Sequence, residues 1–400
     1  MSLAIDIPAD GLAETFAELR ASSVALIDGL TAEDCALQAM PETSPAKWHL
    51  AHTTWFFETF VLEPFAPGYL PVDPSYRILF NSYYNGIGAQ YPRPQRSLLS
   101  RPDLNEVLAY RDTVDAGVLE LLNELPAGPE ADQAVARITL GLHHEAQHQE
   151  LLLTDIKYNL FQNPLFPAFR ETRAGLHAGV PMVPMRWFDM PGGEVNIGSQ
   201  AGDFAFDNEQ PRHPVLLQPF RLASRLVTNA EYLEFIEAGG YSAPEFWLSD
   251  GWTEVCENEL KHPLYWGRVD GQWLEYTLNG LQPLDMAAPV SHVSFFEASA
   301  YAAWAGKRLP TEAEWESAAG LQPVAGNFLD SDQLHPEAAS EHAHEPVQLF
   351  GDCWEWTNSA YLPYPGFSIS QDALGEYNGK FMSGQMVLRG GSCLSQAFHI

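Results

Sequence analysis

The spacing of hydrophobic residues divides the chain into two parts with different patterns. Over roughly the first 165 residues, apolar side chains recur every three to five positions, which predicts helices with one buried face. The first such stripe comprises Leu12, Phe16, Leu19 and Val24. Similar runs cover 44–65, 104–125 and 131–161. Four long helices joined by loops predict an antiparallel bundle.

Two details of this half concern its boundaries and its chemistry. We expect Ser44 to cap the second helix, with Pro45 as the first helical residue. The connection over 67–100 is long and rich in Pro, Tyr and Arg. Long ordered connections often carry functional residues, so this loop is a place to look for a site.

From about Met185 onward the pattern changes to short β-type runs rich in Gly, Pro, Trp and Tyr. Such runs occur at 186–198 and 213–224, and helical patterns interrupt them at 228–240 and 294–320. This mixture predicts an irregular α+β domain. We therefore expect a helical bundle over 1–168, a linker over 169–184 and a second domain over 185–400.

Charge and cysteine usage narrow the function classes. The chain has 21 Lys+Arg against 52 Asp+Glu, a net charge of −31, so we expect neither nucleic acid nor an anionic membrane as a partner. Its four cysteines are scattered, which favours reduced thiols over disulfides or a cysteine zinc site. No signal-peptide pattern and no membrane-length apolar run is present, so we expect a cytoplasmic protein.

The run HEAQH, His144–His148, is the most specific short pattern. On a helix, residues four apart lie within about 40° of rotation, so His144 and His148 can reach one metal ion while His143 points away. H-E-x-x-H is also the zinc-protease signature. The extended protease pattern fails, however, because Leu151 and Thr154 stand where it requires Gly and His.

A second histidine pair, His49 and His52, lies on another predicted bundle helix. Side chains from facing helices build metal sites inside bundles, so one of the pair can complete a site with His144 and His148. Three neutral imidazoles leave two or three positions open on an octahedral metal, which suits iron(II), a substrate sulfur and dioxygen. A hydrogen-bonded core histidine and a zinc hydrolase stay open as alternatives at this point.

Several motifs together resemble one family. The first two are LAH (Leu50–His52) and HEAQHQE (His144–Glu150), and the others are FDNEQPRHPV, GKRLPTEAEWE, GDCWEWTNS and VLRGGSC in the second half. This conjunction resembles the ergothioneine-biosynthesis sulfoxide synthases. The resemblance implies a DinB-like four-helix bundle followed by a C-terminal domain of the formylglycine-generating-enzyme, C-type-lectin-like fold.

The resemblance also implies a site and a reaction. The family's three iron ligands fall on His52, His144 and His148, and Gln147 matches a position that contacts the imidazole substrate. The implied reaction is oxidative joining of a thiol sulfur to C2 of hercynine (trimethylhistidine), with Fe(II) as cofactor, O2 as oxidant and a sulfoxide as product.

The long loop contributes further candidates. It resembles the branch of the family that has two adjacent active-site tyrosines, here Tyr83 and Tyr84, and that takes free cysteine rather than γ-glutamylcysteine. A phenol near the iron can donate a proton or a hydrogen atom. Arg93 and Arg96 are candidates to clamp the carboxylate of the donor, because guanidinium binds carboxylate in a bidentate manner.

Two departures from the family pattern keep other functions open. Ser383–Gly384 and Leu394–Gln396 differ from the cysteine-using enzymes, so a selenoneine synthase, which joins a selenosugar to hercynine, is an alternative. The chain also ends at Ile400, before the closing segment expected from the resemblance, so we expect this domain to be incomplete. A more remote alternative is a non-catalytic ligand-binding module.

Overall fold

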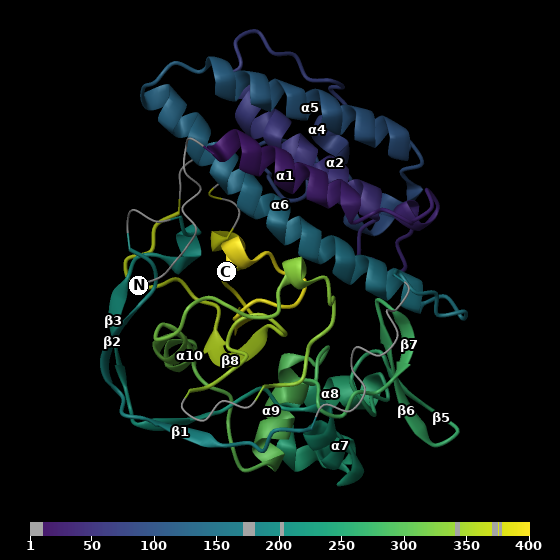
Figure 1. Ribbon diagram of the computed structural model, residues 1–400, viewed down its shortest axis with the longest axis vertical. Coiled ribbons are helices and arrows are strands. Elements are labelled where there is room, and N and C mark those ends of the chain that lie inside the picture. The colour runs from purple at the N-terminus through teal and green to yellow at the C-terminus, as the bar shows by residue number, and fades with distance from the viewer. Residues whose placement is uncertain (1–10, 171–180, 201–203, 341–344, 370–374, 376–377) are drawn as a thin grey trace.

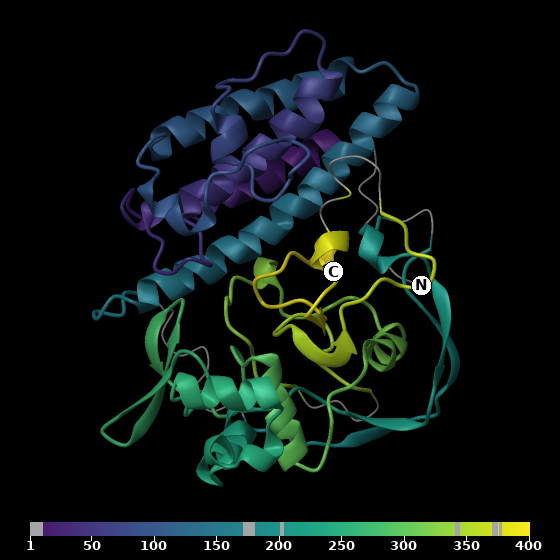
Figure 2. The same cartoon turned by 180° about the vertical axis from the view of Figure 1, so that it is seen from behind.

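A computed structural model describes residues 11–170, 181–200, 204–340, 345–369, 375 and 378–400. Its N-terminal part is a bundle of four long helices, which lies against a C-terminal domain of small sheets and short helices (Figures 1 and 2). The bundle helices are α1 (Leu12–Ala25), α2 (Ala46–Phe57), α5 (Leu104–Glu124) and α6 (Pro129–Phe161). This arrangement confirms the predicted fold class, α+β with an N-terminal helical bundle.

Helix α2 is the central element of the bundle, because it packs against both α5 and α6. Every one of its residues from Ala46 to Phe57 is buried. A helix buried on all sides must satisfy its polar groups internally. Lys47, for example, donates from Nζ to the carbonyl oxygen of Pro102 at 3.1 Å. Histidines on such a helix therefore lie in the interior, where a site can exclude water.

The predicted start of α2 was wrong by one residue. The helix begins at Ala46 and Pro45 occupies the N-cap position without a side-chain cap. Ser44 does not cap because its hydroxyl accepts a hydrogen bond from Nη1 of Arg96 at 2.8 Å, and its backbone N–H donates to Asp155 at 2.8 Å. Tertiary contacts thus use the groups that a local cap would have used.

The long connection after α2 is ordered around one buried carboxylate. A π-helical turn (Glu58–Leu62) and a short helix, α3 (Glu63–Phe65), extend α2. Glu58 then accepts hydrogen bonds from the hydroxyls of Tyr69 at 2.9 Å and Tyr110 at 2.6 Å. The loop continues through α4 (Tyr76–Leu79) and a 3-10 helix (Arg93–Leu98) before α5 begins. Its first part is thereby tied to the bundle interior.

Gly141 allows α2 and α6 to approach closely, and its replacement by alanine should destabilise the protein. A Cβ atom there would lie 2.5 Å from Cε1 and 2.7 Å from Cζ of Phe57. Overpacking of this kind costs about 1–3 kcal/mol of unfolding free energy, which outweighs the gain of up to about 1 kcal/mol from better helix propensity. Urea denaturation of Gly141→Ala measures the effect.

Gly117→Ala, on α5, is the matched control for this prediction. There the new Cβ would meet only the end of the Leu62 side chain, with Cδ1 at 3.1 Å, and that side chain can move. We expect a smaller loss or a gain. Equal stability of the wild type and Gly141→Ala would contradict the close α2–α6 packing described here.

The C-terminal domain contains nine short strands in four antiparallel sheets among the described residues. The first two sheets pair β1 (Trp187–Met190) with β4 (Phe220–Ala223) and β2 (Gly193–Ile197) with β3 (His213–Leu217). The others comprise β5 (Trp266–Val269), β6 (Gln272–Thr277) and β7 (Gly280–Pro283), and β8 (Glu355–Ala360) with β9 (Met386–Arg389). The β-runs expected at 186–198 and 213–224 are confirmed.

The helices of this domain are more numerous than the sequence pattern predicted. They are α7 (Asn229–Glu237), α8 (Ser249–Glu257), α9 (Phe295–Trp304) and α10 (Glu312–Ala319). The run expected over 294–320 is two helices, because Gly306 at φ +67° ends the first and Thr311 caps the second. Helix α8 was missed. None of the helices within the described ranges has the length and apolar character needed to cross a membrane.

Helix α6 runs along the boundary between the two domains and contacts both (Figures 1 and 2). Its Glu150 accepts hydrogen bonds from Nε1 of Trp354 at 2.7 Å and from the hydroxyls of Ser392 at 2.7 Å and Ser395 at 2.6 Å. One helix therefore presents residues to the bundle interior on one face and holds loops of the C-terminal domain on another.

Candidate metal centre

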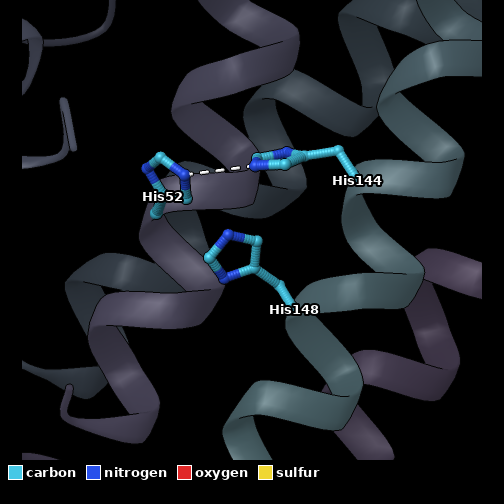
Figure 3. A group of neighbouring side chains, drawn as sticks. All are labelled: His52, His144 and His148. Carbon is cyan, nitrogen blue, oxygen red and sulfur yellow. Dashed lines mark hydrogen bonds between the residues drawn. The ribbon is translucent and has the colours of Figure 1, made fainter. Parts of the chain in front are cut away.

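Three buried histidines converge between α2 and α6. His52 comes from α2, and His144 and His148 come from one face of α6 (Figure 3). One ring nitrogen of each lies within 4.8 Å of those of the other two, and Nε2 of His52 lies 3.3 Å from Nε2 of His144. The predicted trio is thus brought together, and its nitrogens are placed as a shared ion would need them.

The surroundings keep these imidazoles neutral. Burial, together with His144 nearby, lowers the pKa of His52 far below its ordinary value, and burial likewise depresses that of His148. Burial lowers the pKa of His144 to about 4. Nδ1 of His52 donates to the carbonyl oxygen of Phe80 at 2.6 Å, so its lone pair is on Nε2. Neutral imidazoles are the form that binds metals.

Glu145, the acidic residue of HEAQH, points away from this cluster. Its Oε2 accepts from Nη1 of Arg20 at 2.8 Å and its Oε1 accepts from Nη2 of Arg111 at 2.5 Å, and it also accepts from the hydroxyl of Ser23. Burial would raise the pKa of Glu145, but Arg111 and Arg20 lower it to about 2. A zinc hydrolase of the H-E-x-x-H type needs this carboxylate at the metal-bound water. The geometry therefore excludes a hydrolase of the H-E-x-x-H type.

Arg96 lies close to the centre, on the far side of one indole ring. The ring of Trp48 stacks on His52 at 4.6 Å between centroids, and Cζ of Arg96 lies 3.3 Å from the centroid of the Trp48 ring. Burial and the neighbouring Arg93 lower the pKa of Arg96 to about 9. Its hydrogen bonds go to hydroxyls, those of Ser44 at 2.8 Å and Ser82 at 3.4 Å, rather than to a carboxylate.

Arg93 does not join Arg96 in the interior. It is exposed, and its guanidinium donates to the carbonyl oxygen of Glu42. The two arginines lie three residues apart on one 3-10 helix, a spacing that places them on the same side of a regular turn. Their different burial therefore comes from their contacts, Arg93 with Glu42 and Arg96 with Ser44 and Trp48. Of the two predicted carboxylate-binding residues, the structure buries only Arg96.

The two tyrosines of the long loop occupy different environments. Tyr84 is fully buried in the bundle, with its ring 5.8 Å from that of Trp55, which in turn lies 5.6 Å from His52. Tyr83 is half-buried at the domain boundary, and its ring lies 5.6 Å from Phe381 of the C-terminal domain. Tyr84 is thus one ring removed from His52, and Tyr83 connects the loop to the second domain.

The segment Leu394–Gln396, which departs from the family pattern, lies at the boundary between the bundle and the C-terminal domain. Ser395 bonds to Glu150, and Nε2 of Gln396 donates to Oε1 of Gln149 on α6 at 2.7 Å. Lys380, three residues before Ser383, donates to the backbone carbonyl of Tyr83. Gln147, which the resemblance relates to substrate binding, is half-buried on α6.

Sequence reasoning missed the supports around the histidines. His49 was considered only as a rival to His52, yet its ring reaches His148 and Asp155. The one signal in the sequence was that the helix carrying His49 is mostly apolar, which indicates a helix buried on all sides. The arginines that hold Glu145 gave no local signal, because they come from other helices.

Comparison with known proteins identifies the family. Residues 15–152 match the DinB superfamily and 186–347 match the sulfatase-modifying factor enzyme 1-like domain. The hercynine oxygenase of Mycolicibacterium smegmatis is 34% identical over 96% of this chain and 92% of that protein. The chain belongs to the hercynine oxygenase family.

Other relatives agree with this family and its architecture. The hercynine oxygenase of Mycobacterium tuberculosis is 33% identical over 95% of this chain and 91% of its own length. The formylglycine-generating enzyme of Streptomyces coelicolor is 31% identical over 51% of this chain and 77% of its own length. The predicted fold and family are confirmed, and the chain is an oxidoreductase. Membership of an enzyme family counts against the non-catalytic binding module.

Proposed function

We propose that this member of the hercynine oxygenase family joins a thiol sulfur, with cysteine as the favoured donor, to C2 of hercynine in ergothioneine biosynthesis. The observation that carries the proposal is the buried three-histidine cluster. It lies in a chain that matches two hercynine oxygenases over nearly their whole length. The reaction consumes one O2. One oxygen atom enters the product sulfoxide, and the other leaves as water with the hydrogens lost from C2 and from the thiol.

We propose His52, His144 and His148 as the ligands of Fe(II). The donor set supports this, because three neutral imidazoles suit iron, zinc and copper alike and leave other positions open. Iron is preferred over zinc, since zinc has no redox chemistry and an oxygenase requires it. When bound, the iron would supply the site at which O2 and the thiol are activated.

The remaining candidate residues would bind and orient the substrates. A buried guanidinium that bonds only to hydroxyls favours an anionic ligand, so Arg96 would hold the carboxylate of the donor. Gln147 would contact the imidazole of hercynine, and Tyr83 or Tyr84 would donate a proton or hydrogen atom. The free cysteines of the described chain accord with a cytoplasmic location, which we propose as well.

Arg96→Met should raise the KM for the thiol donor by about 10-fold or more, with a smaller change in the KM for hercynine. The reason is that a charged hydrogen bond contributes about 1.5–3 kcal/mol. Steady-state kinetics with each substrate varied in turn measure the effect. Arg93→Met is the control and should leave both KM values near those of the wild type. If both variants behave alike, the assignment of the carboxylate to Arg96 is wrong.

A selenoneine synthase is the second candidate. The observation that favours it is the position of the departing segments, since Ser395 and Gln396 bond to Glu150 and Gln149, the residues of α6 that directly follow His148. Residues there can select between donors without altering the histidines. In that case a selenosugar replaces cysteine, and a C–Se bond to C2 of hercynine forms.

Oxygen uptake tests the proposal in its general form. We expect the full chain loaded with Fe(II) to consume O2 only when hercynine and a donor are both present. Zinc-loaded protein should consume none. Oxygen uptake that does not depend on hercynine, or equal results with zinc and iron, would overturn the proposal.

A further inference from the structure

A chain of hydrogen bonds leads from the histidine cluster to a carboxylate. Nδ1 of His148 lies 2.9 Å from Nδ1 of His49, and Nε2 of His49 lies 2.9 Å from Oδ2 of Asp155. His148 and Asp155 are seven residues apart, about two turns along the same face of α6. His49 comes from the facing helix α2 and lies between them.

With His49 and His148 as neutral imidazoles, the partners define where each proton is. A carboxylate only accepts hydrogen bonds, so His49 donates from Nε2–H to Asp155 and keeps a lone pair on Nδ1. That lone pair accepts the Nδ1–H of His148. The lone pair of His148 is then on Nε2, the nitrogen that faces His52 and His144 (Figure 3).

The side chains of this hydrogen-bonded chain are buried and held in place by other contacts. The side chains of His49 and Asp155 are only 4% and 14% exposed. Oδ2 of Asp155 is further fixed by the backbone N–H of Ser44 at 2.8 Å, at the start of α2. Both helices therefore hold the carboxylate, and solvent has little access to replace either link.

We infer that Asp155 and His49 are positioning residues, which hold His148 in the tautomer and orientation needed to bind a divalent metal. The inference rests on the metal centre of the proposed function. Partners of metal-bound histidines commonly accept the second ring N–H and increase the basicity of the ligand. Here the carboxylate acts through an intervening imidazole, whereas the corresponding N–H of His52 ends on the backbone carbonyl of Phe80.

Two variants at one position separate this role from simple packing. His49→Asn keeps an acceptor oxygen near the place of Nδ1, while His49→Phe keeps a ring of similar volume and has no acceptor. The probe is Co(II), whose affinity is measured by competition with a chelator and whose visible absorption reports ligand geometry. The melting temperature of each metal-free variant is measured alongside.

We expect His49→Phe to weaken Co(II) binding by about 10–100-fold and to alter the Co(II) spectrum. His49→Asn should lose less affinity and retain more of the wild-type spectrum. Asp155→Asn, which removes the charge and keeps the shape, should fall between the wild type and His49→Phe.

Two results would overturn the inference. Wild-type affinity and spectrum in His49→Phe would show that the acceptor is not needed. Equal losses in His49→Asn and His49→Phe, in proportion to lower melting temperatures, would show a packing role only. A wild-type protein that binds no Co(II) would instead remove the proposed metal centre itself, so the two failures are distinguishable.

Discussion

His52→Ala should abolish stable binding of Fe(II) and with it hercynine-dependent turnover. His52 is the only one of the three clustered histidines that α2 contributes, and its Nε2 lies 3.3 Å from that of His144. Without it, two histidines of α6 remain, too few for a closed protein site. Loss of a residue that only hydrogen-bonds to a metal ligand typically costs about 10–100-fold in affinity, and we expect a greater loss here. Chelator competition and metal analysis after gel filtration measure it.

His143→Ala is the matched control for this loss. His143 is also buried and adjacent to a proposed ligand, but its ring stacks on Phe204 at 3.7 Å between centroids and its Nδ1 lies 3.2 Å from that of His399. We expect wild-type metal affinity in this variant. Retention of bound iron by His52→Ala, or equal loss in both variants, would contradict the proposed ligand set.

Glu145→Gln should lower the free energy of unfolding by about 3–5 kcal/mol, because buried Arg111 loses the carboxylate that it bonds to and Arg20 keeps only Asp115. Arg20 and Arg111 both bond to Glu145, and all three side chains are at most 2% exposed. Chemical denaturation of the metal-free protein measures the change. A zinc hydrolase would respond differently, since there the same variant would lose activity with little change in stability.

Stability should also depend on pH through this residue. The pKa of Glu145 in the folded protein, about 2, is below its ordinary value of 4.5. The contribution of Glu145 to the free energy of unfolding is therefore fully present above about pH 4.5 and is lost as the pH falls toward 2.

Glu120→Gln, on the exposed side of α5, is the control for the Glu145→Gln substitution, and its free energy of unfolding should stay within about 0.5 kcal/mol of the wild type. A similarly small change in Glu145→Gln would contradict the buried ion network.

The bundle was predictable because its helices are long and strongly periodic. Parts of the second domain were missed for identifiable reasons. The strands β5–β7 carried a signal that was overlooked, since Asp270 and Gly271, both with positive φ, form the two-residue turn between β5 and β6. Helix α8 also carried a signal that was overlooked, because it is strongly amphipathic, with Gly251 and Val255 buried. Its short length and its internal glycine, which packs directly against Phe296 of α9, made it resemble a loop.

The candidate site divides in the same way. The spacing of His144 and His148 predicts their common face from helix geometry alone, and the resemblance selected His52 over His49. The partners of Glu145 and the link from His49 to Asp155 depend on how α1, α2, α5 and α6 are rotated against one another. The local sequence pattern of a single helix does not predict how it is rotated against the other helices. The separation of Arg93 from Arg96 was equally hidden, because it depends on tertiary contacts of Arg96 with Ser44 and Trp48 that Arg93 does not make.

The most direct test of the central claim is a donor competition with the Fe(II)-loaded protein. Hercynine and O2 are supplied together with cysteine, γ-glutamylcysteine and a selenosugar, and mass spectrometry identifies the adduct at C2. We predict a hercynine–cysteine sulfoxide as the main product, while a selenium adduct would identify the selenoneine alternative. No adduct with any donor, from protein that retains iron, would contradict the proposed oxygenase reaction.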